Sequence, residues 1–328
     1  AIAGFTWGNA LMLLVGILLI YLGARTKREP LLFSLGFGCL LSNLGLGFQG
    51  GFLKPAYDLL ISTGLLPMLV LVGWGATLDF SALISSGKKV WISLAAQTGV
   101  FLALLLALAW KLPVPESAGL AGVVTLNGPA AVIIAAREAP RLLPGVVLVV
   151  YLLNLAAAPL HTVALRLWVP ANEWRETPEA EVDPLPNRAT ILFPIVLTIL
   201  LGILFPAGIP IFGALLFGNL LAASAAALNI TNILKTTVYP ASLFLLGLFL
   251  GLSLQAGAIL NTDLVKILLL GLLGLVINIL VGIWVGRLFR AGGKLDAPLS
   301  LPGNGDVGLL ASCLAGGILM VIATLVGG

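Results

Sequence analysis

Long apolar runs separated by short polar breaks make up almost the whole chain. A helix needs about 20 consecutive apolar residues to cross the hydrocarbon of a bilayer, and most of these runs reach or approach that length. The pattern therefore predicts an all-α integral membrane protein with about ten or eleven membrane segments. The unbroken runs are residues 7–24, 31–48, 59–76, 90–110, 143–168, 190–205, 211–228, 238–256, 264–288 and 306–326.

One further apolar segment, residues 118–136, is interrupted by Leu126-Asn127-Gly128-Pro129. Gly and Pro together interrupt the backbone hydrogen bonds of a helix, and inside a membrane the freed groups need partners in protein or in a water-filled cavity. A similar sequence, Pro302-Gly303-Asn304-Gly305-Asp306, lies near the end of the chain. Two broken helices, one late in each half, indicate a transport site in the middle of the membrane.

The two halves of the chain resemble each other. Residues 35–41 align with residues 215–221, and residues 67–78 align with residues 240–254. Basic residues precede the long helix of the first half and follow that of the second, so the positive-inside rule predicts opposite orientations. We therefore predict an inverted-topology repeat, typical of secondary transporters, against the alternative that Gly- and Leu-rich helices align by chance. The predicted parts are a first membrane half (1–169), a hydrophilic linker (170–189) and a second membrane half (190–328).

Composition narrows the possible functions. The chain is 60% apolar and 9% charged, whereas soluble domains carry about 25% charged residues. The net charge of +4 fits basic residues held in cytoplasmic loops and gives no case for binding nucleic acid. One His and two Cys are too few for a dedicated metal or haem site. Cys39 and Cys313 both fall in apolar runs, so we expect buried thiols and no disulfide.

Polar residues at the two breaks are the candidate ligands of a cation, because sodium is bound by carbonyl, hydroxyl and carboxylate oxygens. We hypothesise one site shared by both breaks, in which Asp306 supplies the carboxylate. The alternative for Asp306 is the N-cap of the last helix. His161 and Asn278, inside apolar runs, are expected to form hydrogen bonds in the core. The hypothesis takes as ligands Thr125, Asn127, Asn304 and Asp306, and as broken-helix backbone Gly128, Pro129, Gly303 and Gly305.

Several short motifs, in this order, carry a resemblance to a known family. They are Glu29-Pro30-Leu31-Leu32, Leu41-Ser42-Asn43, Gly73-Trp74-Gly75-Ala76-Thr77-Leu78-Asp79-Phe80, Ala95-Ala96-Gln97, Asn127-Gly128-Pro129, Ile191-Leu192-Phe193-Pro194, Phe217-Gly218-Asn219-Leu220 and Leu248-Phe249-Leu250-Gly251-Leu252-Ser253. In these motifs the chain resembles the membrane β subunit of sodium-pumping, biotin-dependent decarboxylases of the oxaloacetate, methylmalonyl-CoA and glutaconyl-CoA types. No single motif is specific, but their order is, and the resemblance runs from about Asn9 to Leu299.

The resemblance implies an elevator-like sodium carrier, commonly trimeric, in a prokaryotic-type inner membrane. Such a subunit is not an enzyme alone. It would decarboxylate a carboxybiotin delivered by a partner subunit, consume a proton and export sodium. The family's working residues include an Asp before Gly-Pro of the first broken helix, a Tyr on the next helix, and Asn, Ser and Arg around the second break.

This chain departs from that pattern at several working positions. Asn127 stands where the family has Asp, and Ala297 stands where the family has Asn. Tyr151 is retained as a candidate, although the family's important Tyr falls on Leu153. The Gly/Ser-rich stretch and its Arg have no clear counterpart, and the chain is about one or two helices shorter, with truncation and internal deletion both open. No catalytic residue is assigned.

Three functions remain open from the sequence. The first is a sodium- or proton-coupled carrier of the decarboxylase β type with an altered site. The second is a transport-inactive relative that serves as a structural subunit of a larger membrane complex. The third is an unrelated inverted-repeat carrier for an organic anion. The broken helices favour the first and the lost polar residues favour the second.

Overall fold

The computed structural model describes residues 6–25, 31–46, 53–80, 87–175, 187–224, 228–259, 262–289, 295–296, 300–301 and 305–327. The helices of the first half are α1 (Trp7–Arg25), α2 (Leu31–Leu41), α3 (Leu53–Tyr57), α4 (Leu65–Thr77), α6 (Gly87–Ala95), α7 (Thr98–Ala109), α8 (Val114–Ala121), α9 (Gly128–Glu138) and α10 (Leu143–Trp168). The later elements are β1 (Trp174–Arg175), α11 (Asn187–Leu204), α12 (Ile209–Ala223), α13 (Leu228–Ile233), α14 (Tyr239–Ser253), α15 (Ala256–Ile259), α16 (Thr262–Phe289), β2 (Leu295–Asp296) and α18 (Gly305–Val326).

Seven helices of the described chain are long and apolar enough to cross a membrane: Trp7–Arg25, Lys89–Ala109, Leu143–Trp168, Pro206–Ala223, Leu228–Ser253, Thr262–Phe289 and Gly305–Val326. A bent pair, Leu53–Ser62 with Leu65–Thr77, forms one more candidate, and Leu31–Leu44 and Arg188–Leu204 are shorter apolar helices. With the broken segment α8–α9, these make eleven candidate segments. The prediction of an all-α integral membrane protein is confirmed.

Two of the predicted runs contain bends that the apolar pattern did not show. The run at 59–76 bends by 51° where α3 and its π-helical extension Asp58–Ser62 meet α4. Gly64 has φ +76° at this bend, a left-handed conformation that glycine adopts without steric cost. The run at 90–110 is divided between α6 and α7 at Ala96–Gln97, where the backbone forms a turn.

Helices of one half pack against helices of the other at two matched crossings. At the crossing of α2 with α14, a Cβ on Gly38 would collide with the carbonyl of Leu248, and one on Gly251 with that of Leu35. At the crossing of α12 with α4, a Cβ added to Gly218 would collide with the carbonyl of Val72, and one added to Gly75 would collide with the carbonyl of Leu215. These are the positions that the sequence alignment of the halves pairs with each other.

Side-chain hydrogen bonds to two equivalent carbonyls repeat the match. Asn43 donates from Nδ2 to the carbonyl of Leu254 at 2.8 Å, just beyond α14. Asn219 donates from Nδ2 to the carbonyl of Leu78 at 2.9 Å, just beyond α4. Each bond satisfies a carbonyl freed where a helix ends. Equivalent carbonyls in the two halves are therefore bonded by a side chain from the opposite half.

The direction of the matched helices shows that the repeat is inverted. Tyr57, at the start of the bent pair, hydrogen-bonds Ser253 at the end of α14. Gly73, near the end of α4, packs against Tyr239 at the start of α14. The bent pair and α14 consequently run antiparallel. Because α4 and α14 are the equivalent helices of the two halves, the halves have opposite orientation.

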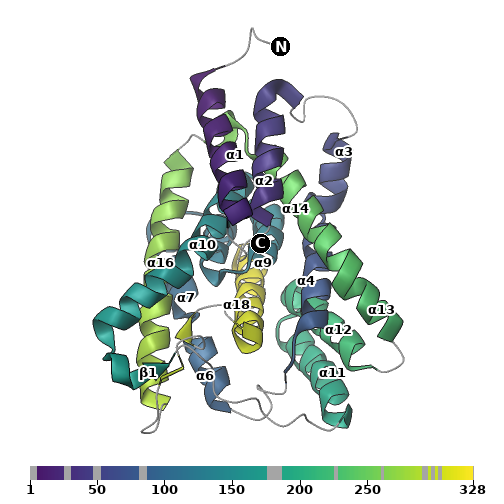
Figure 1. Cartoon of the computed structure of the whole chain (residues 1–328), viewed down its shortest axis with the longest axis vertical. Helices are drawn as coiled ribbons and strands as arrows, with labels where there is room; N and C mark the ends of the chain where they lie inside the picture. Colours follow the sequence, from purple (N-terminus) through teal and green to yellow (C-terminus); the bar gives the residue numbers. More distant parts are fainter. Residues whose placement is uncertain are drawn as a thin grey trace.

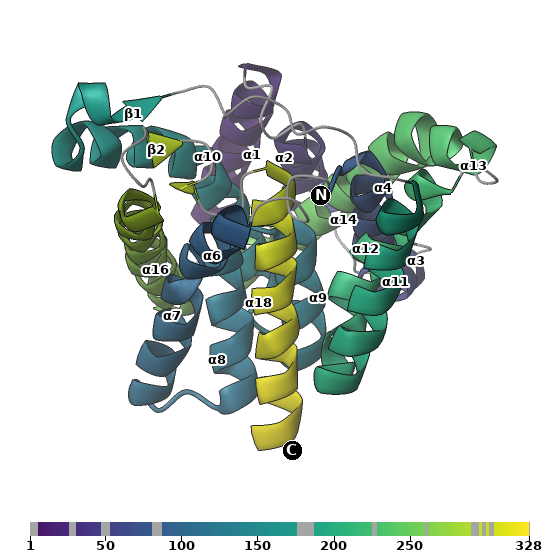
Figure 2. The same ribbon diagram turned by 90° about the horizontal axis from the view of Figure 1, so that it is seen from below.

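The last helix occupies the centre of this arrangement. Figures 1 and 2 show α18 between a group that contains α16, α7 and α6 and a group that contains α12, α11 and α4. It packs against α6, α8, α9 and α12. Within the described residues α18 is unbroken from Gly305, while residues 302–304 of the predicted second break lie outside them. Of the two predicted broken helices, the described chain therefore shows the first.

The predicted linker is only partly described. Its first residues continue from α10 into a short strand pair, in which Trp174 lies opposite Leu295 and Arg175 opposite Asp296 in parallel register. Residues 176–186 lie outside the described residues, and α11 begins at Asn187. The strand pair connects the end of the first half to the chain that follows α16. The division of the chain into two halves and a linker stays a prediction.

Candidate functional site

The helix break in the first half is almost completely buried. After α8 the chain forms a 3-10 turn at Gly122–Thr125, then Leu126 takes a left-handed conformation with φ +56°. Asn127 is extended, and α9 begins at Gly128. A left-handed leucine costs on the order of 1 kcal/mol, so surrounding packing must hold it there. The sequence Gly-Pro predicted this break, and that prediction is confirmed.

Asn127 connects the break to the opposite half of the protein. Its Oδ1 accepts a hydrogen bond from the backbone N of Ala130 at 3.0 Å and so caps α9. Its Nδ2 donates to Ser312 Oγ and to Cys313 Sγ, each at 3.1 Å, on α18. Both amide protons are thus used, and the side chain is fully buried. Asn127 fixes the start of α9 against α18.

Thr125 and Tyr151 complete the immediate surroundings of Asn127. Thr125 Oγ1 donates to the carbonyl of Gly122 at 2.7 Å and accepts from the backbone N of Asn127 at 3.2 Å. The ring of Tyr151, on α10, packs over Gly128, where a Cβ would lie 2.5 Å from ring atoms. Glycine is required at this position because a larger residue would displace the ring. Three of the predicted candidate ligands therefore lie together at the break.

The other candidates lie elsewhere or outside the described residues. Asp306 Oδ2 accepts a hydrogen bond from the backbone N of Asp79 at 2.8 Å, so this carboxylate reaches the end of α4. Asp306 precedes Ser312 by six residues, which is about 9 Å along a helix. Gly305 begins α18 with φ +68°, and Gly303 and Asn304 lie outside the described residues. A single site containing both Asn127 and Asp306 stays a prediction.

The core hydrogen bonds expected from the sequence are present. Asn278 Nδ2, on α16, donates to the carbonyl of Val124 at 3.0 Å, and its Oδ1 accepts from the backbone N of Gly99 at 2.6 Å. His161 Nε2 lies 2.9 Å from Ser300 Oγ. Cys39 and Cys313 are buried and free, as expected. Asn278 thus bonds a carbonyl of the break itself, which makes α16 a support for the site.

Ser93 and Gln97 were not among the candidate ligands predicted from the sequence, although Gln97 belongs to one of the motifs that carry the family resemblance. They lie one helical turn apart at the α6–α7 turn, and both are nearly fully buried, at 2% and 1% exposed. Among the described residues, Ser93 Oγ and both amide atoms of Gln97 have no hydrogen-bond partner. The helix that carries Ser93, α6, packs against α16 and α18, and α7, which follows Gln97, packs against the 3-10 turn of the break. A glutamine in the middle of an apolar run was the available signal.

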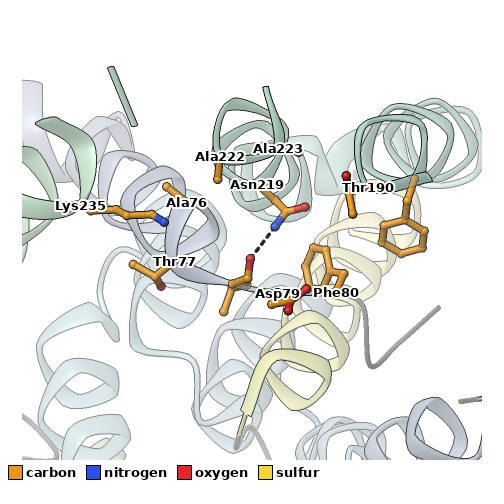
Figure 3. Close-up of a pocket in the computed structure, with 11 residues that line it drawn as sticks. Ala76, Thr77, Asp79, Phe80, Thr190, Asn219, Ala222, Ala223 and Lys235 are labelled. Atoms are coloured by element: carbon orange, nitrogen blue, oxygen red, sulfur yellow. Dashed lines mark hydrogen bonds between the residues drawn. The ribbon is translucent and has the colours of Figure 1, made fainter. Parts of the chain in front are cut away.

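A polar cavity of about 360 Å³ lies where α4 ends, and Figure 3 shows its lining. Its polar lining includes Thr77 and Asp79 at the end of α4, Asn219 of α12 and Lys235, which comes from the opposite side of Ala76 and Thr77 to Asp79. The dashed line in Figure 3 is the bond from Asn219 to the Leu78 carbonyl. The cavity combines one carboxylate, one ammonium group and several neutral hydrogen-bonding groups. Asp306 is tied to its edge through Asp79.

The chemistry available at the break is that of neutral ligands. Hydroxyl, amide and backbone oxygens can coordinate a monovalent cation, but they cannot carry a proton or neutralise the ion. In the described chain no group of three or more His, Cys, Asp or Glu residues could hold a metal ion. The fold and this break together define the class of the protein: a polytopic α-helical membrane protein with inverted repeats around a buried broken helix.

Comparison with known proteins identifies the family. Residues 8–296 match the family described as Na+-transporting oxaloacetate decarboxylase beta subunit, and the chain belongs to this family. It is 31% identical over 324 residues to the glutaconyl-CoA decarboxylase subunit beta of Acidaminococcus fermentans, covering 97% of this chain and 84% of the relative. It is 32% identical over 330 residues to the methylmalonyl-CoA decarboxylase subunit beta of Veillonella parvula, again covering 97% and 84%.

A more distant relative is the oxaloacetate decarboxylase beta chain of Klebsiella pneumoniae, 25% identical over 348 residues and covering 86% of this chain and 80% of the relative. All three relatives are beta subunits or chains of decarboxylases. The resemblance inferred from the motif order is therefore confirmed over most of the chain. The family also makes this protein a membrane subunit of the decarboxylase type.

Proposed function

We propose that this protein is the membrane subunit of a biotin-dependent decarboxylase complex and that it carries sodium across the membrane beside the broken helix. In this proposal biotin is bound to a partner subunit, and sodium is the transported substrate. The observation that carries the proposal is a buried helix break held by polar residues from both halves. Such a break exposes backbone carbonyls at mid-membrane, where transporters bind coupling ions.

The donor set fits a weakly bound sodium ion. Thr125 Oγ1 and the carbonyls at the end of the 3-10 turn are oxygen ligands of the kind that hard cations prefer. Ser93 and Gln97 add side-chain oxygens that have no partner among the described residues. Asn127 contributes no charge, so binding should be weaker than at a carboxylate. The proposed site is therefore a low-affinity one.

Restoring the carboxylate tests this proposal. The partners of Asn127 Nδ2 are a hydroxyl and a thiol, which can reverse roles and donate to an aspartate. Asn127→Asp should therefore fold and should bind sodium more than tenfold more tightly, since one full charge is gained in a site of low dielectric constant. Binding is measured as the sodium-dependent rise in melting temperature of the purified protein, with choline as the control cation.

Transport is measured separately, as uptake of radiolabelled sodium into proteoliposomes that contain the assembled complex. Asn127→Leu is the matched variant, because it removes the polar atoms without adding charge. Uptake above that of empty liposomes by the wild type, reduced by Asn127→Leu, supports the proposal. Equal uptake by wild type, Asn127→Leu and empty liposomes would contradict it.

A second function is favoured by one observation. All the hydrogen-bonding protons of Asn127 are directed to protein atoms, which locks the break rather than leaving it open to an ion. A transport-inactive subunit would need only this locked form. It would assemble with the other subunits and show no sodium uptake, so co-purification combined with the uptake assay separates the two functions.

A further inference from the structure

Two equivalent arms of the repeat have different shapes. In the first half, α3, its π-helical extension Asp58–Ser62 and α4 form an arm that is bent by 51°. In the second half, α13, the π-helix Leu234–Val238 and α14 form the equivalent arm, which is one continuous span, Leu228–Ser253. Each arm has a proline in the first turn of its second helix, Pro67 in α4 and Pro240 in α14. The same element of the repeat is therefore bent in one half and continuous in the other.

One residue accounts for the difference between the arms. Gly64 precedes α4 with φ +76°, and its backbone N donates to the carbonyl of Ile61 at 2.9 Å, which ends the first part of the arm. The residue at the equivalent distance before Pro240 is Thr237, which lies inside the π-helix. A β-branched residue rarely takes a left-handed conformation, so the second arm is held in its continuous form. Glycine takes helical and left-handed conformations alike, so the first arm can adopt both shapes.

The surroundings of Gly64 do not impose the bend. A Cβ added there would have one described atom within 4 Å, Ile133 Cγ1 at 3.7 Å, which is an ordinary van der Waals distance. Ile133 belongs to α9, the helix that begins at the break, and the π-helical extension of α3 also packs against α9. In its bent form the arm therefore lies against the broken helix.

Few contacts hold the outer part of this arm, which comprises α3 and its extension (Leu53–Ser62). No residue of α3 is buried. Lys54 and Asp58 form an ion pair at 3.0 Å with side chains that are 63% and 50% exposed, and such a pair contributes little to stability. Tyr57 hydrogen-bonds Ser253 at the end of α14. A segment with so few buried contacts can move at low cost in free energy.

We propose that Gly64 is the hinge of a gate formed by Leu53–Ser62, which swings between a bent position against α9 and a straight position like that of the second arm. Tyr57 lies about 10 Å along the helix from Gly64, so removing the 51° bend moves this residue by about 9 Å. The movement breaks the hydrogen bond to Ser253 and uncovers α9 beside the break. The hinge is argued from the geometry of the two arms and does not depend on which ion or substrate crosses the membrane.

Thiol labelling measures the opening of the gate. Ser253 lies beneath Tyr57 of the gate, Val70 lies beyond the hinge on α4, and both are buried, as are the two native cysteines. Ser253→Cys and Val70→Cys are introduced separately into the full chain, and the purified protein is labelled with a water-soluble maleimide. We expect slow labelling of Ser253→Cys and protection of Val70→Cys. Gly64→Thr, which copies the second arm, should raise the rate at Ser253→Cys about tenfold, because the left-handed conformation then becomes costly.

Matched variants separate the hinge from general loosening. Gly64→Asn adds a side chain that tolerates the left-handed conformation, so it should leave the labelling rate unchanged. Gly64→Ala should raise the rate less than Gly64→Thr, and it keeps the test available where Gly64→Thr does not fold. Equal labelling of Ser253→Cys with Gly64, Gly64→Ala and Gly64→Thr would overturn the proposal. A parallel rise at Val70→Cys would also overturn it, because the whole arm and not the gate would then be loosened.

Discussion

The matched helix crossings and the central region of the molecule differ in how far they keep the symmetry of the repeat. At the crossings of α2 with α14 and of α12 with α4, equivalent glycines meet equivalent backbone carbonyls. At the centre, the broken helix α8–α9 of the first half lies against α18, which is continuous from Gly305 onward. The symmetry of the repeat is thus retained in helix packing, and the described polar residues at the centre are arranged without it.

This difference has a physical reason. Close helix crossings depend on backbone shape and on the absence of side chains, so any change at either partner costs stability. Polar residues at the centre need partners but not equivalent partners. Asn127, Asn278 and Asp306 each form a hydrogen bond with an element of the other half, and within the described ranges no equivalent bond is formed in return.

The largest expected effect comes from the crossings. Gly75→Ala and Gly251→Ala each place a Cβ against a backbone carbonyl, and the backbone cannot move without separating two helices. We expect each to lower the free energy of unfolding by about 3 kcal/mol, and by similar amounts. Denaturant unfolding in detergent measures this. Gly257→Ala, where a Cβ would meet nothing within 4 Å, is the control. A large loss for only one of the pair would show that the two crossings are not equivalent.

The next largest effect is expected at Asn278, one of the polar residues in the central region. Asn278→Leu removes the partner of two buried backbone groups, the N–H of Gly99 and the carbonyl of Val124. Unsatisfied buried groups cost about 1–3 kcal/mol, so we expect a loss of about 2 kcal/mol and a local loosening of the break. Denaturant unfolding measures the loss of stability, and amide hydrogen exchange at the break measures the local loosening. Val276→Leu, on an exposed part of α16, should change neither. An unchanged exchange rate in Asn278→Leu would remove α16 from the support of the site.

A smaller effect is expected at the two asparagine side chains that donate hydrogen bonds to backbone carbonyls at the helix ends. Asn43 donates to the carbonyls of Leu254 and Cys39, whereas Asn219 bonds chiefly the carbonyl of Leu78. With about 0.6 kcal/mol per interhelical bond, Asn219→Ala should cost about 0.6 kcal/mol and Asn43→Ala somewhat more. The Cys39 thiol also lies 3.7 Å from the Leu254 carbonyl and can replace the lost donor. The cost of Asn43→Ala should therefore rise when Cys39→Ala is added, and simple additivity would contradict this account.

The smallest effect concerns an ion pair between the halves. Arg141 lies 3.1 Å from Glu116 and 3.6 Å from Asp263 on α16. The neighbouring Glu138 lies 3.3 Å from Arg137. Because Arg141 is mostly exposed, Arg141→Gln should cost less than about 1 kcal/mol, and less again in high salt. A salt-independent loss would indicate a packing role for this arginine.

The fold and part of the site followed from the sequence. Apolar runs without charges gave the membrane class, and Gly-Pro after Asn127 gave the position of the break. The glycines that align between the halves proved to be the crossing points. The α6–α7 turn was not predicted because Ala96 and Gln97 lack the Gly-Pro signal of the other break. The partner of Asp306 was not predicted because 227 residues separate it from Asp79.

The sequence by itself determined that this chain crosses a membrane, repeats itself with inversion and breaks a helix at residue 127. Those properties depend on local chemistry, namely side-chain hydropathy and the backbone limits of Gly and Pro. Tertiary structure alone decided the partner of each buried polar group. Asn127 bonds α18, Asp306 bonds the backbone of Asp79, and the side-chain amide of Gln97 has no hydrogen-bond partner among the described residues. Such pairings depend on how distant helices pack, and hydrogen bonds form only where packing brings donor and acceptor within about 3 Å.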